Sequence, residues 1–246
     1  MSENSNGRHH RNFGSRQIYL PKKYNSLYNS DYDNNLNGNK FKFKNSLIIT
    51  PNYEIEFEGT GGIKYIKNHD GCVIFSGANI FAQTNAVQKL PIMLRRGINK
   101  LSDQKKLIVE EKYNYEEKYE IHQNIILYYG ENRLDFQTLF VKNTGLETKD
   151  ITSEFALNFY LPEYSEMLEY KKFTEKNEHK QAFDLLDNAE YIYLSCGKIH
   201  GMTIYPERGQ ILRYKNKSLD ISVANPPELE RNYINIKFYL ERYKLV

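Results

Sequence analysis

The chain has 246 residues, of which 40% are hydrophobic and 26% are charged, and its formal net charge at pH 7 is +3. This length allows one large β domain or two small ones, and a small net charge spread over scattered basic and acidic residues argues against specific binding of nucleic acid. The sequence has no apolar run long enough to form a transmembrane helix, so we expect no insertion into a membrane.

The N-terminal segment differs from the rest of the chain in composition. Residues 1–20 include a basic stretch but lack the apolar segment of a secretory signal, and we expect a protruding arm with a short helix there. Residues 21–40 are rich in Asn and Tyr and contain turn-forming Asn, Asp and Gly, so they are predicted to form an extended linker. By composition alone, both segments are typical of a disordered tail.

From Phe41 onward the pattern is that of β-strands. Apolar and polar residues alternate over residues 41–49 and again over residues 53–59, as expected for strands with one buried face. The region from 79 to 99 differs, because its apolar residues recur at an imperfect helical spacing. We predict a helix there, kinked or split by Pro91.

The second half of the chain continues the β pattern. Alternating segments between residues 106 and 162 predict a run of long strands, and a charged helix is predicted at 175–187. Further short strands close the chain. Residues 41–246 are therefore predicted to form a mainly β domain, an antiparallel β-sandwich with helical insertions at 79–99 and 175–187.

Two short segments invite a chemical interpretation. The glycine-rich stretch Glu58–Lys64 ends in lysine, but a phosphate-binding loop needs a following Ser or Thr and then a helix. A strand continues here instead, so we favour a hairpin turn. Cys196 and His200 could pair as a nucleophile and its base, although no third group orients them. The two cysteines, Cys72 and Cys196, lie far apart, which is typical of free thiols in a cytosolic protein.

Histidine and glutamate residues give no stronger signal of catalysis. The histidines show no spacing typical of metal ligands, and His122, inside a predicted strand, is interpreted as structural. Glu110, Glu111, Glu116 and Glu117 could line a glycosidase cleft, but charged strand faces and turns account for them more simply. We therefore predict no metal site and no enzyme activity.

Two patches of the sequence resemble a known family. Arg11, Phe13 and Arg16 form an Arg-x-Phe-x-x-Arg pattern, followed by the Asn/Tyr-rich tract that ends at residues 35–38. Residues 115–125 combine acidic residues and tyrosines at the start of a predicted strand. In both patches the chain resembles the polyhedrins of cypoviruses, the occlusion-body proteins of insect double-stranded RNA viruses. The chain length and its 21 tyrosines are similar to that family as well.

This resemblance implies a structural protein that assembles with itself. In such polyhedrins the N-terminal helical arm leaves its own subunit and clamps neighbours, which builds trimers and then a crystal that embeds virus particles in the host cell cytoplasm. We expect Arg11 and Arg16 to bind carboxylates or carbonyl groups of a neighbour and Phe13 to fill a pocket there. The resemblance implies no required cofactor, although nucleotides bind between polyhedrin subunits; no residue of this chain is assigned to that site.

Crystals of this family dissolve at alkaline pH, and tyrosine chemistry supplies a physical reason. Tyrosine and lysine titrate near pH 10, so strong alkali would make each subunit strongly negative and the subunits would repel one another. The candidate pH-sensitive tyrosines are Tyr19, Tyr24, Tyr28, Tyr32, Tyr115 and Tyr119.

Two other functions stay open at this point. A carbohydrate-binding β-sandwich module is one, because tyrosine-rich sheet faces suit contacts with sugars and residues 61–71 could open such a domain. The absence of tryptophan and of a secretory signal argues weakly against it. The other is a cytosolic enzyme built around Cys196.

Overall fold

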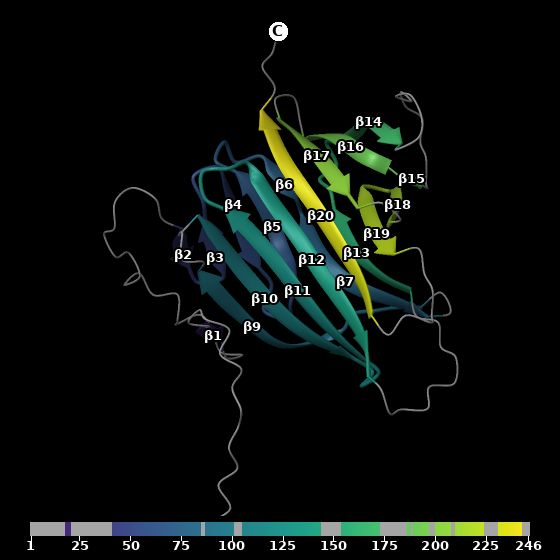
Figure 1. Ribbon diagram of the computed structural model, residues 1–246. Helices are drawn as coiled ribbons and strands as arrows, with labels where there is room; N and C mark the ends of the chain where they lie inside the picture. The colour runs from purple at the N-terminus through teal and green to yellow at the C-terminus, as the bar shows by residue number, and fades with distance from the viewer. Residues whose placement is uncertain are drawn as a thin grey trace, which may run out of the picture.

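The computed structural model describes residues 18–20, 41–84, 87–100, 105–143, 154–172, 186–187, 189–196, 200–207, 210–223 and 231–242. These residues form two antiparallel sheets that pack face to face as a β-sandwich (Figure 1). The mainly β sandwich predicted from the sequence is thus confirmed. Within the described ranges every regular element is a strand, and no helix there could cross a membrane.

One layer is a nine-stranded sheet built around long, regularly paired strands. Its C-terminal strand lies between two segments that are distant in sequence, as the yellow strand in Figure 1 shows. In order across the sheet, the strands are β1 (Ile18–Leu20), β9 (Ile92–Lys100), β10 (Lys106–Tyr115), β11 (Tyr119–Tyr128), β12 (Arg133–Lys142), β20 (Arg231–Arg242), β17 (His200–Pro206), β16 (Ala189–Cys196) and β14 (Ser165–Lys172).

The other layer is an eleven-stranded sheet of shorter strands. Nine of them follow one path, in the order β15 (Leu186–Asp187), β18 (Gln210–Lys215), β19 (Ser218–Val223), β13 (Glu154–Tyr160), β7 (Gly77–Thr84), β5 (Ile63–Asn68), β4 (Tyr53–Phe57), β3 (Leu47–Ile49) and β2 (Lys42–Lys44). Off this path, β6 (Val73–Phe75) pairs with β5, and β8 (Val87–Lys89) pairs with β7.

The core lies between the sheets and follows directly from the alternation in the sequence. Along β10 every second residue is buried, from Leu107 to Tyr115, and the residues between them face outward. Four phenylalanines join the two layers: Phe75 and Phe159 come from the eleven-stranded sheet, Phe136 and Phe238 from the nine-stranded one. The ring centroids of Phe136 and Phe159 are 5.0 Å apart and those of Phe75 and Phe238 5.2 Å, in edge-to-face contact.

The predicted helix at 79–99 is wrong, because β7, β8 and β9 occupy this region. Residues Ile80 to Ala82 on β7 are all buried, so this strand lacks the alternation that marks a half-buried strand. A continuous apolar run of this kind cannot be told from a buried helix by periodicity alone. Pro91 lies between β8 and β9 and separates two strands, where a helix kink was expected.

Other predicted boundaries fall partly outside the described residues. Ile18–Leu20 is strand β1, paired with β9 through Ile98, Gly97 and Arg96, where a helical arm was expected. An apolar triplet beside an open sheet edge gains backbone hydrogen bonds by pairing there. Residues 1–17 of the arm and the linker 21–40 lie outside the described ranges.

The second helix was predicted at residues 175–187. Residues 175–185 lie outside the described ranges, and Leu186–Asp187 is strand β15, so the helix is wrong at its end. Strand β14, Ser165–Lys172, was not predicted from the sequence. It pairs with β16 in a register that shifts twice.

Candidate functional site

A groove of about 570 Å³ opens on the outer face of the nine-stranded sheet, the face turned away from the core. This volume falls in the range of sites that hold small molecules, which is about 300–1,000 Å³. It lies over β9 to β12 and β20. The residues that line it are Arg95, Glu110, Glu111, Lys112, His122, Asn124, Gln137, Thr138, Leu139, Ile234 and Asn235.

Strand register places four polar side chains in one row across the groove. Glu110 pairs with Asn124, Asn124 with Gln137, and Gln137 with Asn235. Residues paired directly across strands point to the same face, with Cβ atoms about 4.5–5.5 Å apart. One carboxylate and three amides therefore follow one another across four strands. At the β9 end of the row stands Gly97, which pairs with Glu110 and adds no side chain.

A second row beside the first carries charges that are neutralised within the protein. Lys112 pairs with Arg95 on one side and with His122 on the other. Lys112 Nζ lies 2.6 Å from Glu120 Oε2, and His122 Nε2 lies 2.5 Å from Glu120 Oε1. Burial acts to raise the pKa of Glu120, but the hydrogen bonds and charges of Lys112 and His122 outweigh it and lower the pKa. His122 thus has a partner, as expected, although it also faces the groove.

Asn235 is held in place by a network at the end of the row. Its Nδ2 donates to Glu207 Oε1 at 2.7 Å, and its backbone oxygen accepts from Gln210 Nε2 at 3.2 Å. The side-chain oxygen of Gln210 accepts in turn from the backbone N–H of Glu207 at 3.1 Å. Among the described residues, nothing donates to the buried Oδ1 of Asn235. The side chain of Asn235 is thus oriented by Glu207 at the end of the row.

Tyrosine rings continue the outer face beyond the groove. Tyr239 on β20 and Tyr205 on β17 have ring centroids 5.5 Å apart, and Tyr205 and Tyr191 on β16 have centroids 6.1 Å apart. Arg133 lies over Tyr239, with its guanidinium carbon 5.6 Å from the ring centroid. This guanidinium is fixed by two hydrogen bonds to Asp135, of 2.8 and 2.6 Å. The tyrosines form an ordered aromatic patch on the same face as the groove.

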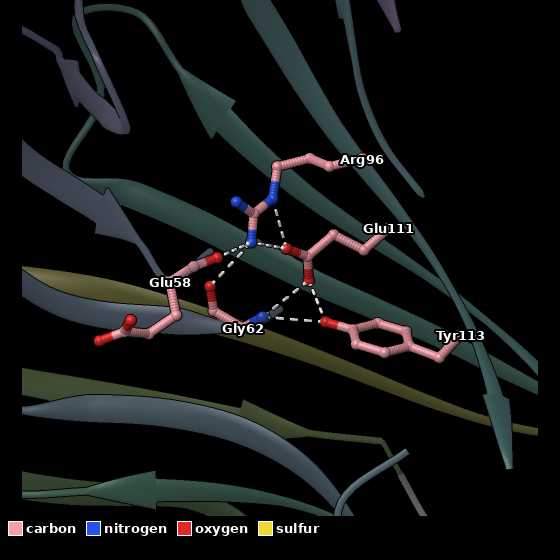
Figure 2. Close-up of polar contacts among 5 residues, drawn as sticks. All are labelled: Glu58, Gly62, Arg96, Glu111 and Tyr113. Carbon is pink, nitrogen blue, oxygen red and sulfur yellow. Dashed lines mark hydrogen bonds and ion pairs between the residues drawn. The ribbon is translucent and has the colours of Figure 1, made fainter. Parts of the chain in front are cut away.

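Beneath the groove, a buried polar cluster joins the two sheets (Figure 2). Arg96 on β9 donates from Nε to Glu111 Oε1 at 2.7 Å and from Nη2 to the backbone oxygen of Glu58 at 2.7 Å. The other carboxylate oxygen of Glu111 accepts a short hydrogen bond from the Tyr113 hydroxyl. That hydroxyl accepts from the backbone N–H of Gly62 at 2.9 Å. The cluster binds β9 and β10 to the turn between β4 and β5, and we assign it a structural role.

The glycine-rich stretch is a hairpin turn, as predicted. Gly61 and Gly62 have φ angles of 110° and 77°, a conformation that side chains other than glycine disfavour. A Cβ added to Gly62 would lie 2.5 Å from the backbone oxygen of Ala78, so the site also has no room for one.

The four glutamates considered for a glycosidase cleft do not converge. Glu110 lies in the groove row, whereas Glu111 is buried beside Arg96. Glu116 pairs with Lys89 at 2.6 Å, and Glu117 lies beside it in the turn between β10 and β11. The side chain of Cys196 is outside the described part of the structure, so its pairing with His200 stays untested.

Residues expected from the resemblance are mostly beyond the described ranges. Tyr115 is 3% exposed and packs edge-on against Phe155, with ring centroids 5.5 Å apart. Tyr119 packs on the same ring at 4.8 Å, and burial raises its pKa. Tyr19 lies on β1, and nothing is described of its side chain. The remaining residues outside the described ranges are Arg11, Phe13, Arg16, Tyr24, Tyr28 and Tyr32.

The sequence did not predict Asn124, Gln137 or Asn235 as site residues. Each occupies an outward position on an alternating strand, and this was the one signal that could have marked them. Only the register shows that they meet.

Solved structures that share this fold include two from Enterococcus faecalis. An α-mannosidase from Enterococcus faecalis matches with a TM-score of 0.56 and 13% sequence identity, over 80% of this chain and 29% of that chain. A protein of glycosyl hydrolase family 38 from the same organism matches with a TM-score of 0.51 and 12% identity, over 80% of this chain and 30% of that chain. This chain spans less than a third of either protein, and at this identity the likeness shows the fold alone.

No family model matches the chain, and no curated protein does. The resemblance to cypovirus polyhedrins therefore stays a prediction. What the structure and the comparisons establish is a two-sheet antiparallel β-sandwich.

Proposed function

We propose that the chain is a carbohydrate-binding β-sandwich module that holds a neutral sugar in the outer groove. The observation that carries this proposal is the row of Glu110, Asn124, Gln137 and Asn235 across a groove of ligand size. Every sugar hydroxyl both donates and accepts a hydrogen bond. Amide side chains also carry both a donor and an acceptor, so a row of amides suits a ring with several hydroxyls.

The electrostatics of this face favour a neutral sugar over a charged one. Lys112 and His122 share the carboxylate of Glu120, and Arg133 is paired with Asp135 at 2.6 Å. These cations are engaged within the protein, so an acidic sugar would have to compete for them. A neutral hexose would use the amide row without disturbing any of these pairs.

The shared fold adds support for the class of ligand. Both solved structures described above are named as glycoside-cleaving proteins, and this chain matches a part of each. We propose binding without bond cleavage, because hydrolysis requires two carboxyl groups facing one glycosidic bond. Glu111 faces the core, and Glu120 is held by Lys112 and His122.

Calorimetric titration with glucose, galactose and mannose tests the proposal. We expect at least one of these hexoses to bind, and Gln137→Ala to lower its affinity about 10-fold, the equivalent of one hydrogen bond of about 1.4 kcal/mol. Lys64→Ala is the matched control, because Lys64 is exposed on the opposite sheet, where it pairs with Glu56 at 3.0 Å. Absence of binding by all three hexoses, or unchanged affinity in Gln137→Ala, would contradict the proposed site.

A further inference from the structure

The aromatic patch beside the groove points to a ligand longer than one sugar. We propose that the groove and the rings of Tyr205, Tyr239 and Tyr191 form one continuous site, and that its ligand is a chain of neutral sugars. This inference rests on the proposed function and specifies the class of ligand. The groove would hold one sugar unit by hydrogen bonds, and the tyrosines would hold the units that follow.

The strand register makes the two parts neighbours. Tyr205 pairs with Lys237, which lies two positions from Asn235 along β20. Both Asn235 and Tyr205 face outward, and diagonal neighbours of this kind are about 7–8 Å apart. A chain that leaves the groove at Asn235 therefore reaches Tyr205 without crossing a gap. The aromatic patch then continues from β20 over β17 to β16, where Tyr191 lies.

The tyrosine rings suit sugars in shape and in chemistry. Tyr205 is 40% exposed, so part of its ring is open to a ligand. A pyranose ring has an apolar C–H face that packs on an aromatic ring, while its hydroxyls reach the tyrosine hydroxyl at the edge. Tyr239 and Tyr205 meet at 85°, so they present a ring face and a ring edge side by side.

One ring of the aromatic patch, that of Tyr239, is contacted by a side chain that is itself held in place. Arg133 lies over Tyr239 and is fixed by its bidentate pair with Asp135. A side chain that is already ordered loses little entropy when a ligand packs on it.

The surroundings of the patch argue against a protein partner as its occupant. Large contiguous apolar patches on a protein surface mark sites of contact with other proteins. Here the exposed Lys237 pairs across strands with both Tyr205 and Asp135, so charged residues interrupt the rings. The most exposed apolar side chains of the described residues, Leu90 and Ile92, lie elsewhere, at β9 and the turn before it.

The test is a series of linear oligosaccharides of the hexose that binds, from the monosaccharide to the hexasaccharide, titrated by calorimetry. We expect affinity to rise with chain length and then to level off, with a gain of about 3- to 10-fold for each ring contact. Tyr205→Ala should remove this gain and leave monosaccharide affinity unchanged, while Tyr205→Phe should keep most of it. Tyr160→Ala is the matched control, because Tyr160 is 47% exposed on the other sheet.

The outcomes separate this inference from the proposed function. Equal affinity for the monosaccharide and the hexasaccharide in the wild-type protein, or an unchanged length dependence in Tyr205→Ala, would overturn the extended site while the single-sugar groove stands. Failure of every sugar to bind would overturn both. A change in oligomeric state in Tyr205→Ala without loss of the length-dependent gain would assign the tyrosines to a contact between copies of the chain and overturn the inference.

Discussion

Replacing Arg96 with methionine is expected to lower the free energy of unfolding by about 3–5 kcal/mol, the cost of removing one partner from a buried ion pair. The side chain of Glu111 has no solvent exposure, and that of Arg96 is 10% exposed. Without the guanidinium, Glu111 keeps a charge in the core with no cation beside it, and the backbone oxygen of Glu58 loses a donor. Urea denaturation followed by tyrosine fluorescence measures the loss, since the chain has no tryptophan.

Two further variants isolate the cause. Arg95→Met changes the exposed neighbour and should alter stability by less than about 0.5 kcal/mol, as for most surface substitutions. The double variant Arg96→Met with Glu111→Leu removes both charges and should recover part of the lost stability. It should stay below the wild type, because Gly62 and Tyr113 also bond to Glu111. A loss in Arg96→Met no larger than in Arg95→Met would show that the cluster does not hold the sheets together.

Raising the pH above 10 is expected to unfold the protein cooperatively. Burial raises the pKa of Tyr53 and of Tyr113 well above the ordinary value of a tyrosine. The pKa of Tyr65 is raised to about 12, by burial first and then by its hydrogen bond to Glu56. In the unfolded chain these hydroxyls ionise near pH 10. Between about pH 10 and 12 the unfolded state therefore binds fewer protons than the folded state, and the free energy of unfolding falls as pH rises.

Tyrosinate absorbance and circular dichroism, recorded together against pH, measure this transition. Exposed tyrosines should ionise first, and the buried ones should ionise together with the loss of β structure. Tyr53→Phe should shift the transition to higher pH, although it removes a hydrogen bond of 3.0 Å to the backbone oxygen of Arg133 and lowers stability at neutral pH by about 1 kcal/mol. Ionisation of all tyrosines in a single step near pH 10, with the fold intact, would contradict the expectation.

The same titration bears on the alkaline switch expected from the resemblance to polyhedrins. Tyr119 has a pKa raised by burial, so it ionises later than an exposed tyrosine. If copies of the chain form a lattice, the negative net charge of each copy in alkali would have to come first from ionisation of other tyrosines and from deprotonation of lysines.

Strands were predicted correctly from the sequence where one face of the strand is buried and the other is exposed to solvent. The strands β4 and β10 show strict alternation of burial, and both were predicted from their residues. Prediction from the sequence failed at β7, where Ile80, Phe81 and Ala82 are all buried and the period of two disappears. Burial on both faces depends on which elements cover the strand, and the sequence of the strand itself does not contain that information.

The groove escaped prediction for a related reason. Asn124, Gln137 and Asn235 belong to three strands, and each alone is an ordinary polar residue on a solvated face. These three side chains are neighbours only in the observed strand register. A slip of one residue would turn the side chains of one strand to the other face of the sheet. Register across β12 and β20 is fixed by packing of the whole sheet, and no local pattern records it.

The position of β20 has a consequence for how the chain reaches its folded state. This strand follows all others along the described chain, yet it lies between β12 and β17 in the nine-stranded sheet (Figure 1). Until β20 has been synthesised, β12 at the edge of the β9–β12 half and β17 at the edge of the β14–β16–β17 half each lack the strand with which they pair in the folded sheet. Pairings this distant in sequence form slowly, and open edges invite pairing with other chains. The nine-stranded sheet is therefore completed only after β20, through Arg242, has emerged from the ribosome.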